Sequence, residues 1–219
     1  MTVATPPLQW KLLVTPLGGL EEPEDLGLVR LDGREVGAFL VDPGAHGKPG
    51  LEIRRRVEQA LPGDPADLFL RLHRKLADTA GASLAMLRIL PAEGVVHFSG
   101  VGTIRGLIVS SAVHRVRSAA GVLGVGLPVP PVRLEARWGP GSWAILASDG
   151  LVEGWDLDRL RLHPFRSIDG MVDRIRKLGP RLPDDASMLL IGEPAEARAP
   201  AAAPRRSGRQ RSLPGADSR

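Results

Sequence analysis

The apolar residues of this chain fall into short runs separated by glycine and proline, and this spacing limits the folds that it can form. Most runs have the alternation or the β-branched content of strands, and Asp32-Gly33 gives the signature of a hairpin turn. In three places the apolar spacing changes to the period of a helix. The order is strands, two helices, a long series of strands, one helix and one strand. It predicts antiparallel sheets whose faces are covered by helices, an α+β layered sandwich.

The same spacing gives approximate bounds for each element. The expected strands span 10–14, 27–31, 36–41, 83–90, 95–100, 103–109, 113–117, 132–138, 143–147 and 187–191. The first helix spans 48–61 and carries one apolar face. Asp64 is the expected N-cap of the second helix, which places Pro65 at its first position. The third helix spans 167–178 and ends at Gly179-Pro180.

Composition narrows the class of protein. A chain of 219 residues, of which 43% are apolar, is long enough for one domain with its own core. It contains no cysteine, which excludes disulfides, zinc–thiolate sites and thiol catalysis. No apolar stretch approaches the roughly 20 residues that span a bilayer, and the N-terminus lacks the basic and apolar pattern of a secretion signal. These features predict a soluble cytoplasmic protein without a membrane partner.

The positive charge is concentrated near the C-terminus. The formal net charge is +4, and residues 193–219 carry six arginines against three acidic residues. The remaining residues are close to neutral, which argues against a nucleic-acid-binding domain. The segment 193–219 is rich in Ala, Pro, Arg, Ser and Gly, and we expect it to be disordered. The expected organisation is a frayed terminus over 1–9, one domain over 10–192 and a basic tail over 193–219.

Acidic residues stand at the edges of four apolar runs. Three of these runs are expected core strands, and a carboxylate at the end of a buried strand needs a partner because its desolvation is unfavourable. If the strand ends meet at one rim, the carboxylates form an all-oxygen pocket of the kind that Mg²⁺ and Mn²⁺ prefer. Taken singly, each is more often a turn or a helix cap. The four pairs are Glu24-Asp25, Asp42-Pro43, Asp149-Gly150 and Asp184-Asp185.

These acidic pairs belong to a longer series of motifs. The series resembles that of the type 2C metal-dependent protein phosphatases (the PPM superfamily), and most closely their bacterial branch, typified by the stage II sporulation protein E phosphatase domain and RsbX. The resemblance extends over about residues 24–192, nearly all of the expected domain. The motifs are Val41-Asp42-Pro43-Gly44-Ala45-His46-Gly47, Gly81-Ala82-Ser83-Leu84-Ala85, Phe98-Ser99-Gly100-Val101-Gly102, Leu123-Gly124, Ala147-Ser148-Asp149-Gly150-Leu151 and Asp184-Asp185-Ala186-Ser187.

The resemblance implies a specific architecture and a metal site. The fold would be a four-layer α-β-β-α sandwich, in which helices flank two antiparallel sheets and two Mn²⁺ or Mg²⁺ ions bind at one end. By the same resemblance, Asp42 bridges both ions and Pro43 contributes its backbone carbonyl. Asp149 and Asp184 match the other ligands of one ion, and Asp25 matches a residue near the second.

The activity that the resemblance implies is that of a protein-serine/threonine phosphatase, a hydrolase. Two divalent ions would activate a water for in-line attack on phosphoserine or phosphothreonine. The substrate would be a phosphorylated regulatory protein in a bacterial signal-transduction pathway. His46 is the expected general acid for the leaving seryl oxygen; the alternative is a loop histidine that hydrogen-bonds a carbonyl. The other histidines are expected on the surface without a role: His73, His97, His114 and His163.

The chain departs from the family pattern at three positions. Pro43 replaces the glycine after the bridging aspartate, and its ring restricts Asp42 to extended conformations. Ala45 replaces the second glycine of the signature, and Glu24 replaces a glycine upstream. These departures leave open a catalytically silent binding module of the same fold. A third hypothesis is a nucleic-acid adaptor that acts through the basic tail.

Overall fold

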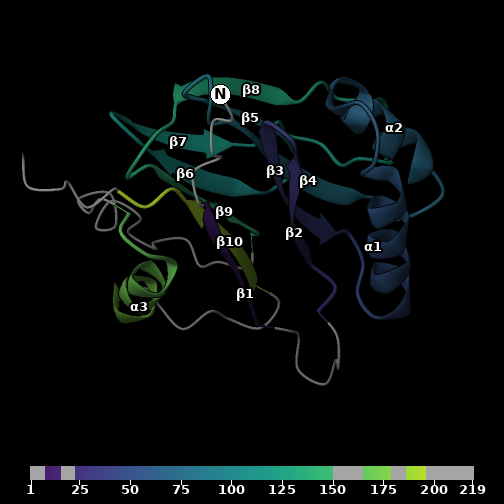
Figure 1. Cartoon of the computed structure of the whole chain (residues 1–219). Coiled ribbons are helices and arrows are strands. Elements are labelled where there is room, and N and C mark those ends of the chain that lie inside the picture. Colours follow the sequence, from purple (N-terminus) through teal and green to yellow (C-terminus); the bar gives the residue numbers. More distant parts are fainter. Residues whose placement is uncertain (1–7, 16–22, 150–164, 179–185, 196–219) are drawn as a thin grey trace, which may run out of the picture.

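The computed structural model describes residues 8–15, 23–149, 165–178 and 186–195, which form two sheets of five strands (Figure 1). The first sheet has the order β1 (Gln9–Thr15), β10 (Ala186–Gly192), β9 (Trp143–Ala147), β6 (Arg105–Val109) and β7 (Val113–Arg117). The second has the order β2 (Leu26–Asp32), β3 (Glu35–Pro43), β4 (Ala82–Leu90), β5 (Val95–Val101) and β8 (Val132–Arg137). All neighbouring strands pair antiparallel.

The space between the two sheets is filled by the inward-facing residues of the strands. On β4 these are Ala85, Leu87 and Ile89, at the alternate positions that a strand directs to one face. Leu146 of β9 and Leu189 of β10 belong to the same cluster on the other sheet. All of these side chains are fully buried, so the apolar alternation of the sequence forms the central core.

Helices cover the outer face of each sheet (Figure 1). α1 (Lys48–Ala60) and α2 (Leu68–Lys75) share a hydrophobic cluster with β3 and β4, to which α2 contributes Leu68 and Leu72. α3 (Ile168–Leu178) shares another with β6, β9 and β10, to which it contributes Met171 and Ile175. The predicted four-layer α-β-β-α sandwich is therefore confirmed.

The two helices on the second sheet begin at residues that the sequence marks as helix starts. A short 3₁₀ helix, Pro65–Asp67, precedes α2, and the carboxylate of Asp64 accepts a hydrogen bond from the backbone N–H of Ala66 at 2.8 Å. Asp64 is thus an N-cap with Pro65 at the next position, as predicted, but of the 3₁₀ helix that leads into α2, and the N-cap residue of α2 itself is Asp67. Before α1, Gly47 has φ 68° and ψ −142°, a conformation that residues with a Cβ rarely adopt. This glycine lets the chain turn sharply from β3 into α1.

His73 corrects one expectation of the sequence. The histidine was expected on the surface of a helix, but only 8% of it is exposed. Its Nδ1 accepts a hydrogen bond from the backbone N–H of Gly124 at 3.2 Å. The loop between β7 and β8 therefore covers this face of α2, and His73 fixes the loop in place.

Candidate metal centre

The candidate site lies where the strands of the second sheet end. β2 pairs with β3 up to Leu26 and Val41, so the next residues, Asp25 and Asp42, follow at the same edge. β3 remains paired with β4 as far as Pro43. The strand register therefore places Asp25, Asp42 and the carbonyl of Pro43 at one edge of the second sheet.

The first sheet ends on the same side of the molecule. β9 pairs with both β6 and β10 as far as Ala147, and Ser148 and Asp149 follow directly. Ser148 continues the pairing, since its N–H donates to the carbonyl of Ser187 at 3.0 Å. β6 begins opposite Ala147, and residues 102–104 alone separate it from β5 of the second sheet. This short turn brings Asp149 to the same rim as Asp42.

Thr103 connects the turn between the sheets to the candidate site. The sequence predicts Thr103 inside a strand, but β6 begins at Arg105, and Thr103 lies in the turn. Its hydroxyl donates to Oδ2 of Asp42 at 3.4 Å, and its backbone N–H donates to Oγ of Ser83 at 3.2 Å. Because Ser83 is also paired with Asp42 across β3 and β4, the aspartate is positioned from both sides.

Pro43 fits the backbone that the structure shows. It is the last residue of β3 and lies opposite Ala82, so both it and Asp42 are in the extended conformation that proline allows. No peptide bond of the described residues is cis. The next residue, Gly44, donates its N–H to the carbonyl of Gly81 at 2.9 Å. The replacement of glycine by proline therefore leaves the strand, and the carbonyl at this position, in place.

The buried side chain of Glu24 contacts the exposed side chain of His46 beside these aspartates. The Glu24 side chain is 2% exposed and that of His46 is 59% exposed; Oε2 of Glu24 lies 2.8 Å from Nδ1 of His46. The other carboxylate oxygen, Oε1, accepts the backbone N–H of Gly47. Since a carboxylate only accepts hydrogen bonds, the ring carries a proton on Nδ1.

The absence of a side chain at Gly50 allows Glu24 to reach this position. A Cβ at Gly50 would lie 3.1 Å from Cδ of Glu24 and would collide with the carbonyl oxygen of Ala45. Gly50 is buried in the first turn of α1. The loop that carries His46, the start of α1 and the buried carboxylate therefore pack as one unit.

The predicted metal ligands differ in their surroundings. Asp25 is 5% exposed, Asp42 is half-buried and Asp149 is exposed, whereas Asp184 lies outside the described residues. The donors at the rim are carboxylate and carbonyl oxygens, whose chemistry fits Mg²⁺ or Mn²⁺. Among the described residues, no group of three or more His, Asp or Glu side chains is close enough to hold an ion. The assignment of Asp25, Asp42, Pro43, Asp149 and Asp184 as metal ligands stays a prediction.

Two features of the site were not found from the sequence. One is the hydrogen bond from Thr103 to Asp42. The turn glycine directly before Thr103 was the only sign in the sequence that this residue lies in a turn. The other is the contact of Glu24 with His46, 22 positions away in the chain. No local pattern reports such a contact, because it depends on how β2 and the start of α1 pack.

The comparison with protein families decides the classification. The family model of stage II sporulation protein E (SpoIIE) matches residues 53–192, more than half of the chain. The chain belongs to the SpoIIE family of PPM-type phosphatases. The match begins inside α1 and ends with β10, so it includes Asp149 and the strands β4 to β10, whereas β1, β2 and β3 precede it, together with Asp25, Asp42 and His46. No curated protein matches the chain.

Solved structures of bacterial phosphatases share the fold of this SpoIIE-family chain. RsbX in complex with magnesium is 19% identical, with 84% of this chain and 94% of that chain covered and a TM-score of 0.71. The serine/threonine phosphatase of S. agalactiae is 14% identical, with 84% and 99% covered and a TM-score of 0.67. The RsbU and RsbW domains of Rv1364c from Mycobacterium tuberculosis are 17% identical, with 87% and 62% covered and a TM-score of 0.67. At these identities the likeness concerns the fold.

Proposed function

We propose that this protein is a metal-dependent serine/threonine protein phosphatase that hydrolyses phosphoserine or phosphothreonine of a regulatory protein. The observation that carries the proposal is the arrangement of acidic residues and a histidine at the rim of the sandwich. There, Asp25 and Asp42 end adjacent strands, Asp149 follows from the other sheet, and His46 is held beside them by Glu24. Membership of the SpoIIE family of PPM-type phosphatases supports the reaction class.

Under this proposal, two Mn²⁺ or Mg²⁺ ions are assigned to the carboxylate and carbonyl oxygens at the rim, together with Asp184, which lies outside the described residues. Asp42 would contribute to both ions and Pro43 would add its backbone carbonyl, while Asp149 and Asp184 would contribute to one ion and Asp25 would lie near the other. When bound, such ions supply a water acidic enough to give hydroxide near neutral pH and neutralise charge on the phosphoryl oxygens. Magnesium is present in the similar structure of RsbX, which supports a divalent ion here.

The chain itself supplies the proton for the leaving group. His46 projects from the loop between β3 and α1, and its ring, in a side chain that is more than half exposed, would donate a proton to the departing seryl or threonyl oxygen. Glu24 fixes the ring orientation through Nδ1 and stabilises the positive charge that the ring carries as an acid. Glu24 also accepts a hydrogen bond from the backbone N–H of Gly47, so one carboxylate positions both the His46 ring and the backbone next to it.

The proposed substrate is a phosphorylated protein rather than a metabolite. One similar structure is described as a serine/threonine phosphatase, and another under the heading of the bacterial stressosome as a modular system that controls secondary messenger signalling, which supports a role in signalling. Among the described residues, no helix is long and apolar enough to cross a membrane. We propose a bacterial cytoplasmic signalling pathway as its setting.

Hydrolysis of two substrates tests the proposal. The full chain is incubated with Mn²⁺ and either a phosphoserine peptide or 4-nitrophenyl phosphate, and released phosphate or nitrophenol is measured. We expect turnover of both, loss with EDTA, and a fall of at least about 100-fold in kcat for Asp42→Ala. Asp173→Ala, at an exposed position on α3, is the matched control and should keep full activity. Activity that is unchanged by EDTA or by Asp42→Ala would remove the proposal.

A catalytically silent binding module is the second candidate. The observation that favours it is that the described residues contain no group of three carboxylates or histidines close enough to hold an ion. Titration with Mn²⁺ separates the two candidates, because the silent module would bind no metal even at about millimolar concentration, whereas a phosphatase must bind it.

A further inference from the structure

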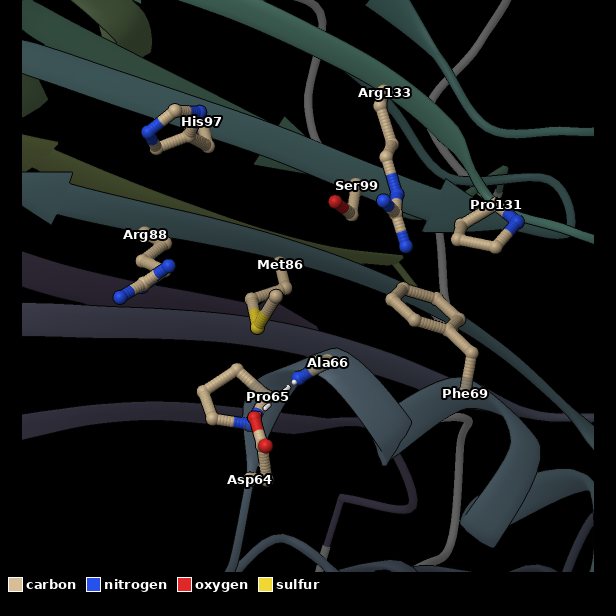
Figure 2. A pocket seen from close by; sticks show the side chains of 10 residues that line it. All are labelled: Asp64, Pro65, Ala66, Phe69, Met86, Arg88, His97, Ser99, Pro131 and Arg133. Carbon is tan, nitrogen blue, oxygen red and sulfur yellow. Dashed lines mark hydrogen bonds between the residues drawn. The ribbon is translucent and has the colours of Figure 1, made fainter.

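A pocket of about 240 Å³ opens on the outer face of the second sheet, away from the rim (Figure 2). Its floor is formed by β4, β5 and β8, and its other wall by the short 3₁₀ helix and the start of α2. None of the candidate metal ligands lines it. The pocket is therefore a separate feature of the fold.

The strand register aligns polar side chains across the floor of this pocket. Ser99 of β5 lies directly opposite Arg133 of β8, and Met86 of β4 lies opposite Ser99 on the other side. Directly opposite residues on one face of a sheet are neighbours. Figure 2 shows the Arg133 guanidinium and the Ser99 hydroxyl together above Met86, with Phe69 and Pro65 on the facing wall.

Two of the polar groups in the pocket are unused. Ser99 is 9% exposed and Arg133 is exposed, and neither side chain makes a hydrogen bond or ion pair with the described residues. Both side chains can therefore bond a ligand in the pocket without giving up a partner within the protein. Arginine is always charged and presents a planar set of donors that suits carboxylate and phosphate groups.

The other polar residues of the pocket already have partners. Arg88 lies 2.6 Å from Glu35, His97 lies 3.6 Å from Glu135, and the Asp64 carboxylate caps the backbone N–H of Ala66. The available groups are therefore a cationic donor and a hydroxyl, which together favour an anion.

The remaining walls of the pocket are apolar. Phe69 and Met86 are nearly buried, Pro65 lies on the wall opposite the strands, and Pro131 directly precedes β8 on the side of the strands (Figure 2). Small-molecule sites combine apolar walls with a few convergent polar groups, as here. The volume corresponds to about eight water molecules at roughly 30 Å³ each, enough for a ligand of about ten non-hydrogen atoms.

We propose that this pocket binds a compact anionic small molecule, in which a carboxylate or phosphate-type group is attached to a small apolar body. Arg133 holds the anionic group, the Ser99 hydroxyl donates a further hydrogen bond to it, and the apolar body lies against Phe69 and Met86. The bound ligand bridges the start of α2 to β5 and β8. This site is independent of the proposed hydrolysis.

Calorimetric titration of the full chain with phenylphosphonate tests this proposal. EDTA is included throughout, so that the probe cannot bind through a metal at the rim. We expect one site with a Kd of about 1 mM or tighter. Arg133→Gln should weaken it about tenfold, and Ser99→Ala about threefold. Arg137→Gln, on the same face of β8 but outside the pocket, is the matched control and should change the Kd by less than about twofold.

Five results would overturn the proposal, four of which concern the small probes and the variants. These four are no binding by the wild-type chain up to about 10 mM, equal effects of Arg133→Gln and Arg137→Gln, no effect of Ser99→Ala, and equal affinity for the uncharged analogue benzyl alcohol. In the last titration, the probe is a glycine pentapeptide with one central aspartate. If it binds tighter than phenylphosphonate, the occupant is an acidic side chain of a partner protein, and the small-molecule assignment is wrong. Thermal unfolding of each variant without ligand shows whether it is folded.

Discussion

The pair formed by Glu24 and His46 allows a test of the proposed proton donor. In Glu24→Gln the side-chain shape is retained but the charge is lost. The backbone N–H of Gly47 can only donate, so the carbonyl oxygen of the new amide must accept it. The amide nitrogen then faces Nδ1 of His46 and donates to it. The substitution therefore forces the ring into the tautomer with its proton on Nε2 and removes the anion that stabilises the charged, acidic form.

The magnitude of this effect follows from the geometry. A hydrogen bond to a charged group contributes about 1.5–3 kcal/mol, and Glu24 makes such a bond to His46 at 2.8 Å. The His46 side chain is 59% exposed, so water screens the interaction and the lower end of that range applies. We therefore expect kcat to fall about tenfold on a substrate that needs the acid.

Two substrates distinguish the loss of the acid from general damage to the site. A seryl oxygen leaves only with a proton, whereas 4-nitrophenolate is a stable anion and leaves without one. Glu24→Gln should reduce kcat about tenfold for a phosphoserine peptide and by less than about twofold for 4-nitrophenyl phosphate. Glu58→Gln, on the exposed face of α1, is the control and should change neither.

A double-mutant cycle completes this test. If Glu24 acts through the histidine, Glu24→Gln should have no further effect on the phosphoserine peptide in a His46→Asn background. The reasoning is refuted if both substrates lose activity equally. It is also refuted if the effect of Glu24→Gln persists undiminished in the absence of His46.

Three further predictions concern stability and are measured by chemical denaturation. Gly47→Ala should lower the free energy of unfolding by about 1–3 kcal/mol, and by more than Gly33→Ala. Both glycines have positive φ and open space around the position of a Cβ, so steric contacts do not distinguish them. The ψ of Gly47 is −142°, which adds backbone strain for alanine, and equal decreases in the free energy of unfolding would contradict this explanation. His73→Leu should lower the free energy of unfolding by about 1–3 kcal/mol because the buried N–H of Gly124 loses its acceptor. An unchanged free energy of unfolding would show that this hydrogen bond does not stabilise the fold. Asp64→Ala should cost about 1 kcal/mol through loss of the N-cap, and no change would mean that Asp64 does not stabilise α2.

The local elements of the fold could be predicted from the sequence. The strands 113–117 and 143–147 have the predicted bounds, and the N-cap at Asp64 is confirmed. These features depend on residues that are near one another in the chain. The order of strands in the sheets could not be read in this way, since it depends on pairings such as that of β1 with β10 at opposite ends of the chain.

The candidate site was predictable to a similar extent. The sequence placed Asp25 before an apolar run and Asp42 and Asp149 after such runs, and the structure has these three aspartates at ends of strands, while their role as metal ligands stays a prediction. It gave no sign that Glu24 would contact His46, or that Gly50 must lack a side chain for that contact to form. It also misplaced His73, because a loop from a distant part of the chain covers that face of α2. Contacts made by tertiary packing have no signal in the local pattern.

Direct titration with Mn²⁺ tests the central claim that the aspartates at the rim hold divalent ions. Calorimetry on the full chain should show binding with a Kd below about 1 mM, and Asp42→Asn should weaken it at least about tenfold. Asp173→Asn, on the exposed face of α3, should leave the affinity unchanged. Wild-type protein that binds no Mn²⁺ at millimolar concentration, or an Asp42→Asn variant that binds it as tightly as the wild type, would contradict the account.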